Sequence, residues 1–181
     1  QYNLGVMHET GKGVAPDYKK AVYWHCKAAE QGNVDAQFNL GLMYEFGKGV
    51  SQDYKRAVEW YTKGAKQGNA DAQFNLGLIY EFGKGVSQNH KRAVEWYIKA
   101  AKQGNAHAQN NLGLDYYNGK GLPRDDKKAV QWFSKAAKQG HVRGQNNLGV
   151  MYDYGNGVPE DKKTAVYWYT KAGQQGFATA Q

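Results

Sequence analysis

Residues 37–72 read QFNLGLMYEFGKGVSQDYKRAVEWYTKGAKQGNADA. The same unit of 36 residues continues in both directions without a gap, and residues 73–108 match it at 30 of 36 positions. A strict period of about 20–50 residues predicts a repeat array in which each unit packs on its neighbours. We therefore expect one array over residues 1–181, with repeats at 1–36, 37–72, 73–108, 109–144 and 145–180.

The first half of each unit predicts a helix. Ala36, Leu40 and Tyr44 follow at four-residue spacing, which places them on one helical face. Gly47 ends the helix because glycine readily adopts the left-handed conformation. Three copies carry a capping asparagine just before the helix, at Asn33, Asn69 and Asn105. His141 and Phe177 stand at the same position and are not expected to cap.

The second half predicts a second helix of about 13 residues, antiparallel to the first. Asp53 can cap it, and its counterparts are Asp17, Asn89, Asp125 and Asp161. Tyr61 belongs to its apolar stripe, while lysines and arginines occupy the opposite face. Gly41 lies inside the first helix, where glycine costs up to about 1 kcal/mol. We expect it to permit close approach of the second helix at Ala57.

The combined motif resembles a known family. The first helix and turn read Ala-x-Ala-Gln-x-x-Leu-Gly-x-x-Tyr-x-x-Gly-x-Gly-Val, and Asp-x-x-Lys-Ala-x-x-Trp-Tyr-x-Lys-Ala-Ala-x-Gln-Gly follows. This pattern resembles the Sel-one-like repeat family, which is related to tetratricopeptide repeats. With the repeat pattern, the resemblance implies an all-α fold, a right-handed α–α superhelical solenoid of five helix-turn-helix repeats. It also implies an adaptor or scaffold that binds proteins.

Composition narrows the function classes. The net charge is +8 and the isoelectric point is about 9.4, so an acidic partner or nucleic acid has to be considered. Cys26 is the one cysteine, so neither an intramolecular disulfide nor a cysteine-based metal site is expected. The five histidines fall at five different repeat positions, which predicts no metal site. We expect no catalytic residues and no cofactor, hence no enzyme.

The face of the first helix turned away from its partner is the candidate binding site. In tetratricopeptide-like arrays the matching positions line a concave groove, and here they carry aromatic, amide and acidic residues. The candidate ligand-binding residues are Tyr2, Asn3, Phe38, Asn39, Leu42, Glu45, Phe46, Phe74, Asn75, Leu78, Glu81, Phe82, Asn111 and Tyr117. They predict a peptide or protein partner with apolar and basic residues. The asparagines either bind a ligand backbone or bond to the next repeat.

Two alternatives compete with the scaffold. The resemblance includes a cysteine-rich bacterial branch described as penicillin-binding or β-lactamase-like, which would imply a peptidoglycan-related enzyme; its paired cysteines are missing here. The basic convex side could instead bind nucleic acid. We expect no such binding, because the aromatic and basic residues are predicted to point in different directions. The tryptophans at one repeat position, Trp60 among them, are expected to pack between helix pairs.

No apolar run is long enough to span a membrane. The sequence predicts a soluble fragment and leaves its compartment open. A secreted or periplasmic bacterial location fits if a leader peptide was removed.

Overall fold

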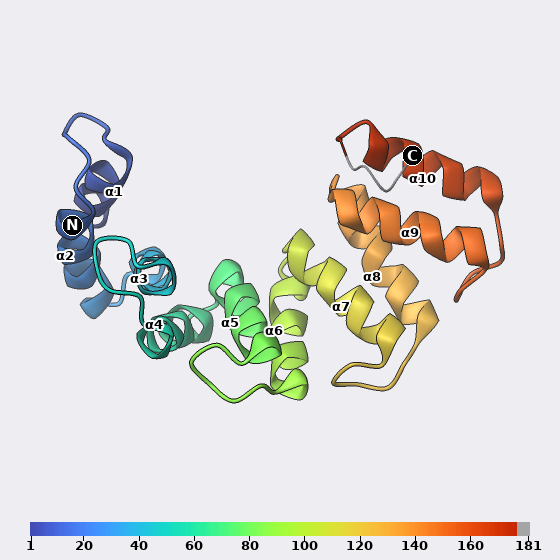
Figure 1. The fold of residues 1–181 in the computed structure, drawn as a ribbon, viewed down its shortest axis with the longest axis horizontal. Coiled ribbons are helices and arrows are strands. Elements are labelled where there is room, and N and C mark those ends of the chain that lie inside the picture. The colour runs from blue at the N-terminus through green and yellow to red at the C-terminus, as the bar shows by residue number, and fades with distance from the viewer. Residues whose placement is uncertain (177–181) are drawn as a thin grey trace. The chain divides into compact units, whose positions relative to one another are not determined.

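The computed structural model describes residues 1–176, which form ten helices and no strand (Figure 1). The helices are α1 (Tyr2–Thr10), α2 (Tyr18–Glu30), α3 (Val34–Phe46), α4 (Tyr54–Lys66), α5 (Ala70–Phe82), α6 (His90–Lys102), α7 (Ala106–Asn118), α8 (Asp126–Lys138), α9 (Val142–Tyr154) and α10 (Lys162–Gly173). From α2 to α9 each helix has 13 residues, as the period predicts.

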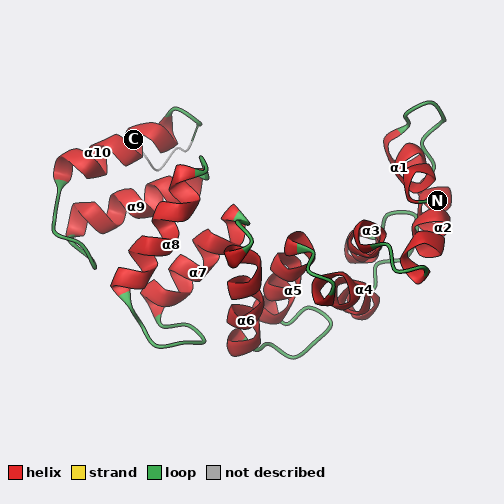
Figure 2. Ribbon diagram, turned by 180° about the vertical axis from the view of Figure 1, so that it is seen from behind, coloured by secondary structure: helices red, strands yellow, loops and turns green. Residues whose placement is uncertain are grey.

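The described residues form two compact units, residues 1–89 with α1 to α5 and residues 90–176 with α6 to α10. Within each unit, consecutive helices pack against one another, as in an all-α solenoid. Thus α9 and α10 lie side by side and are joined by a loop at one end (Figures 1 and 2). The loop between the two helices of a repeat is longer than the turn that leads to the next repeat (Figure 2). In the second repeat the loop covers residues 47–53 and the turn covers residues 67–69.

Side-chain caps fix where the helices begin. Asn33 accepts a hydrogen bond from the backbone N–H of Ala36 at 2.8 Å, and Asp53 accepts one from Arg56 at 3.1 Å. The expectation for His141 was wrong, because its Nδ1 accepts from the Gly144 N–H at 3.1 Å. An imidazole nitrogen can replace the asparagine oxygen because both present a lone pair close to the backbone. Phe177 lies outside the described residues.

Gly41 does permit close approach of the second helix, but the contact is with Tyr61 rather than Ala57. A Cβ atom on Gly41 would lie 2.5 Å from two Tyr61 ring carbons. In the same way, a Cβ atom on Gly113 would lie 2.6 Å from two Phe133 ring carbons. The glycine therefore makes room for a ring that the second helix presses against the first.

These rings form the core of the array. Tyr61, Tyr97 and Phe133 are at most 1% exposed, and so are Leu40, Leu76 and Leu112. The tryptophans are half-buried instead of enclosed. Trp168 does pack against the buried cluster around Phe133, which agrees with the expected packing role.

A pair of glutamines joins each repeat to the one before it. Gln37 is 4% exposed, and its Nε2 donates to the carbonyl of Ala29 in the preceding repeat at 3.1 Å. Its Oε1 accepts from Gln67 Nε2 at 2.8 Å. Gln109 makes the same two bonds, to the Ala101 carbonyl and from Gln139. This glutamine joint gives both the nitrogen and the oxygen of a buried amide a hydrogen-bond partner, as buried polar groups require.

The second glycine of the turn also connects repeats. Gly49 has a φ of 73°, and a Cβ there would lie 2.3 Å from the backbone oxygen of Tyr18. The turn after α3 therefore rests on the start of α2, one repeat earlier. The Gly-Lys-Gly turn is both a helix stop and an inter-repeat contact.

Candidate functional site

The candidate site in residues 1–89 is the outward side of the first helices, which we call the first-helix face. The helices α3 and α5 contact each other directly. The predicted residues on this face are Tyr2 and Asn3 from α1, Phe38, Asn39, Leu42, Glu45 and Phe46 from α3, and Phe74, Asn75, Leu78, Glu81 and Phe82 from α5.

The ends of α3 and α5 expose two large apolar side chains. Phe46 and Phe82 are each 61% exposed, at equivalent positions one repeat apart. Leu42 and Leu78 lie one turn earlier on the same helices and are half-buried. Exposed aromatic groups next to half-buried apolar ones are typical of a contact surface.

Phe38 and Phe74 are half-buried and so remain partly accessible. The Phe38 ring centroid lies 6.0 Å from that of Tyr61, which anchors one side of it in the core. Tyr2 similarly lies 5.7 Å from the buried ring of His25. These rings form the floor of the face, whereas Phe46 and Phe82 project from it.

Glu45 is largely occupied by its own protein. Its Oε2 accepts a 2.7 Å hydrogen bond from the Tyr61 hydroxyl, and Lys84 Nζ of the next repeat lies 3.7 Å from Oε1. The side chain is only 13% exposed. Burial, with the neighbouring Glu45 charge second, raises the pKa of Tyr61 well above its usual range.

The same arrangement changes in the first repeat, where His25 takes the place of Tyr61. Its Nε2 lies 3.6 Å from Glu9 Oε2, and its ring is completely buried with neither nitrogen in a hydrogen bond. Burial lowers the pKa of His25, and the Glu9 carboxylate opposes that shift.

Asp35 and Asp71, at the start of α3 and α5, are more exposed than Glu45, and Asp35 Oδ1 accepts a 3.4 Å hydrogen bond from Asn69 Nδ2 of the next repeat. Helical spacing places Asp35 on the predicted face, since Asp35 and Phe46 are eleven residues apart. Neither aspartate is among the predicted ligand-binding residues. In residues 90–176 the same position carries His107 and Arg143, both exposed, so the acidic side chain does not recur there.

The asparagine position is partly structural. Asn75 Nδ2 donates to the Tyr61 hydroxyl of the preceding repeat at 3.2 Å. Asn147 Nδ2 donates to Asn110 Oδ1 at 2.9 Å. Asn39 is half-buried and Asn3 is exposed.

Asn111 and Tyr117 belong to α7 in the second compact unit, apart from the other predicted site residues. Asn111 Oδ1 accepts a 3.4 Å hydrogen bond from Asn110. The Tyr117 ring faces the Arg124 guanidinium at 5.2 Å. The structure therefore brings the predicted residues of α1, α3 and α5 into one unit and leaves these two in another.

The prediction that aromatic and basic residues point in different directions was wrong for the second helices. Lys63 Nζ lies 3.8 Å from the centroid of the Trp60 ring. The same pairing, at 4.1 Å, joins Lys99 to Trp96 and Lys135 to Trp132. Lysines three residues after a tryptophan lie on the same side of the helix, and a cation is attracted to the indole face.

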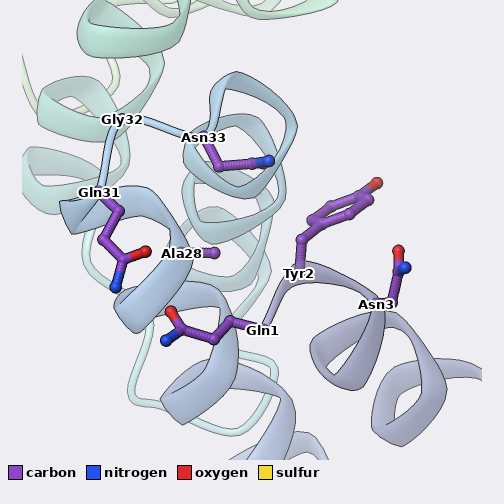
Figure 3. Close-up of a pocket in the computed structure, with 7 residues that line it drawn as sticks. All are labelled: Gln1, Tyr2, Asn3, Ala28, Gln31, Gly32 and Asn33. Carbon is purple, nitrogen blue, oxygen red and sulfur yellow. The ribbon is translucent and has the colours of Figure 1, made fainter.

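A pocket of about 660 Å³ opens beside the start of α1 (Figure 3). Its lining includes Gln1, Tyr2, Asn3 and, from the α2–α3 turn, Gln31 and Asn33. Tyr2 and Asn3 are the only two of its lining residues that belong to the predicted site.

Residues 1–176 contain no group of three or more histidine, cysteine or acidic side chains that could hold a metal ion. Over the same residues, no helix combines the length and apolarity that a membrane crossing requires.

Comparison with known proteins identifies the repeat. The Sel1 repeat model matches five times in succession, at residues 1–33, 34–69, 70–105, 106–141 and 142–177. No match was found among curated protein sequences.

Solved structures agree with this assignment. A protective antigen of uropathogenic Escherichia coli with an SLR fold is 40% identical, with a TM-score of 0.96 over 99% of this chain and 38% of its own. A Sel1 repeat protein of Oxalobacter formigenes is 38% identical, with a TM-score of 0.92 over 99% of this chain and 71% of its own. Cysteine-rich protein B of Helicobacter pylori is 26% identical, with a TM-score of 0.57 over 71% of this chain and 92% of its own.

The chain thus spans well under half of the E. coli antigen. The 36-residue period of the present chain, its two-helix unit and the five family matches all indicate the same repeat. The chain belongs to the Sel1 repeat family.

Proposed function

We propose that this protein is a non-enzymatic scaffold that binds a peptide or protein segment on the first-helix face of α3 and α5. Sel1 repeat proteins are in general protein-interaction scaffolds. The observation that carries the proposal is the pair Phe46 and Phe82, each 61% exposed on helices that contact each other.

The chemistry of the face favours a partner with apolar and basic residues. Phe46 and Phe82 offer aromatic contact area, and hot spots at protein interfaces concentrate in a few such side chains. Asp35 and Asp71 offer exposed carboxylates at the opposite end of the same helices. Glu45 contributes less to charge attraction than Asp35 does, because Tyr61 and Lys84 already surround it.

The test compares partner capture by the wild-type protein and by the Phe46→Ala/Phe82→Ala double variant. Both side chains are exposed, so the variant keeps its fold, which circular dichroism checks. Tyr23→Ala is the matched control, since Tyr23 is 54% exposed on α2, away from this face. We expect a defined set of proteins, quantified by mass spectrometry, to be lost with the double variant and kept with the control.

Equal capture by all three proteins would contradict the proposal. A second arm replaces Asp35 and Asp71 by Asn and measures the association rate of a captured partner. We expect this variant to associate more slowly, because removing charge at the rim of an interface slows association more than it speeds dissociation.

A further inference from the structure

A second pocket lies between the end of α8, the start of α9 and the middle of α10. Its volume is about 370 Å³, and it is lined by Ala137, Lys138, Gln145, Tyr167, Trp168 and Lys171 among others. All of these residues belong to one compact unit. We call it the α8–α10 pocket.

The pocket is cationic. Lys138 and Lys171 supply two ammonium groups, no carboxylate is among the lining residues, and no ion pair within residues 1–176 involves either lysine. The Gln145 amide is already engaged within the protein, because its Nε2 donates to the Ala137 carbonyl at 3.3 Å and its Oε1 accepts from Gln175 at 2.9 Å.

The carbonyls that end α8 are also satisfied. The backbone N–H of Gln139 and of His141 both reach the Ala136 oxygen, and that of Gly140 reaches the Ala137 oxygen. Their negative dipole is therefore partly neutralised by these donors. The lysine ammonium groups remain as the polar groups directed to solvent.

The aromatic wall differs from that of the central repeats. There the lysine three residues after the tryptophan lies over the indole ring, as Lys135 does over Trp132 at 4.1 Å. Lys171 lies instead 5.7 Å from the Tyr167 ring centroid. The Tyr167 and Trp168 rings meet edge to face, with their centroids 5.0 Å apart. Within the described residues no cation lies over the Trp168 ring.

The corresponding positions in the second repeat exclude such a site. Tyr167 corresponds to Glu59, and Lys138 corresponds to Glu30. Two carboxylates thus stand where the α8–α10 pocket has a ring and an ammonium group, so an anion would be repelled there.

We propose that the α8–α10 pocket binds an anionic group attached to an apolar or aromatic one. Lys138 and Lys171 bind the carboxylate or phosphate, and the attached group packs against Trp168 and Tyr167. An acidic segment of a partner protein with a neighbouring aromatic side chain has this chemistry, and so does a phosphorylated aromatic residue. A nucleic acid fits less well, because base stacking needs open ring faces and lysines cover those of Trp96 and Trp132.

Nuclear magnetic resonance of the indole N–H groups tests the proposal, since the chain has five tryptophans whose signals single Trp→Phe variants assign. The probes are 3-phenylpropionate, phenyl phosphate, the uncharged 3-phenylpropanamide and a short oligothymidylate. We expect the two small anions to shift the Trp168 signal saturably, more than the signals of the other four. The uncharged amide should have little effect.

The Lys138→Gln/Lys171→Gln variant should weaken binding of the favoured anion about fivefold, the order expected for two partly exposed ion pairs. The matched control is Lys102→Gln/Lys135→Gln, the equivalent pair one repeat earlier, and it should leave the affinity unchanged. A stronger response to phenyl phosphate than to 3-phenylpropionate would favour a phosphorylated partner, and the reverse would favour a carboxylate.

Four results would overturn the proposal. The Trp168 signal does not move with either anion, or it moves equally with the uncharged amide. The lysine variant binds as well as the wild type, or the oligothymidylate shifts the indoles of several repeats more strongly than the small anions do. Each outcome is independent of the first-helix face, because none of the substituted residues lies on α3 or α5.

Discussion

At the scale of single residues, His141 shows how one side chain can serve two repeats. Its Nδ1 caps α9, so the neutral ring carries its proton on Nε2 and can donate to His107 Nδ1, which lies 3.0 Å away. The two imidazole rings meet edge to face, with their centroids 4.7 Å apart. Protonation of His141 at Nδ1 removes the lone pair that caps α9. Acid therefore opposes the cap.

We predict that this pair makes the array sensitive to acid. Burial, then the His107 and Arg143 charges, lowers the pKa of His141 from 6.5 to about 4. The unfolded chain therefore binds the proton first, so the stability is full above pH 6.5 and is lost as the pH falls toward 4. Because the ring is half-exposed, screening reduces the loss to about 1 kcal/mol.

The variant His141→Asn isolates this effect, since asparagine caps the equivalent helices without titrating. Denaturant unfolding at pH 7 and pH 4.5 should show a smaller stability loss for the variant than for the wild type. The buried His25 titrates in both proteins and cancels from the difference. Identical pH dependence of the two proteins would contradict the prediction.

At the scale of elements, neighbouring positions on the second helix have different roles. Tyr97 is completely buried, whereas Trp96 beside it is half-buried under Lys99. The expected packing of the tryptophans between helix pairs therefore leaves part of the Trp96 surface accessible. Adjacent residues on a helix point about 100° apart, so only one of them can face the core.

We predict that Tyr97→Ala costs about 3–5 kcal/mol of unfolding free energy, as expected for a fully buried aromatic residue. Trp96→Ala should cost roughly half as much, because part of its surface is already in water. Urea denaturation of the two variants in parallel measures the difference. A larger loss for Trp96→Ala would show that the tryptophan is the main packing element after all.

Helix positions and caps could be predicted from the sequence because they depend on local spacing. Leu40 and Gly47 mark a helix and its end wherever the fold places them. The role of Glu45 could not be predicted, because its partner Tyr61 is 16 residues away. An acidic residue on a helical face gives the same sequence pattern whether its carboxylate contacts solvent or a buried hydroxyl group.

The candidate face was predictable as a set of positions, but not the exposure of each side chain. Phe38 and Phe46 are both phenylalanines of α3, yet one is half-buried against Tyr61 and the other is 61% exposed. The difference arises from the neighbouring helices, whose placement the repeat period does not specify. Binding by these residues stays a prediction until a partner is found.

At the scale of the whole molecule, stability should grow with the number of repeats, because contacts run between consecutive helices. We predict that a fragment of residues 1–140, which retains α1 to α8, keeps the helicity per residue of the full chain. Its melting temperature should fall by roughly 5–10 °C, since one neighbour interface is lost. Circular dichroism measures both quantities. Complete loss of helical signal would indicate one indivisible core instead.

The glutamine joint has a consequence for how such chains change over generations. Each repeat carries both halves of the joint, an amide near its beginning and a carbonyl with a second amide near its end. Any copy can therefore follow any other. An unequal crossover between tandem gene segments can insert or delete a whole number of 36-residue units. The protein that results still forms the glutamine joint between its consecutive repeats. Copy number is free to drift by whole units, while the displayed side chains of each copy diverge independently.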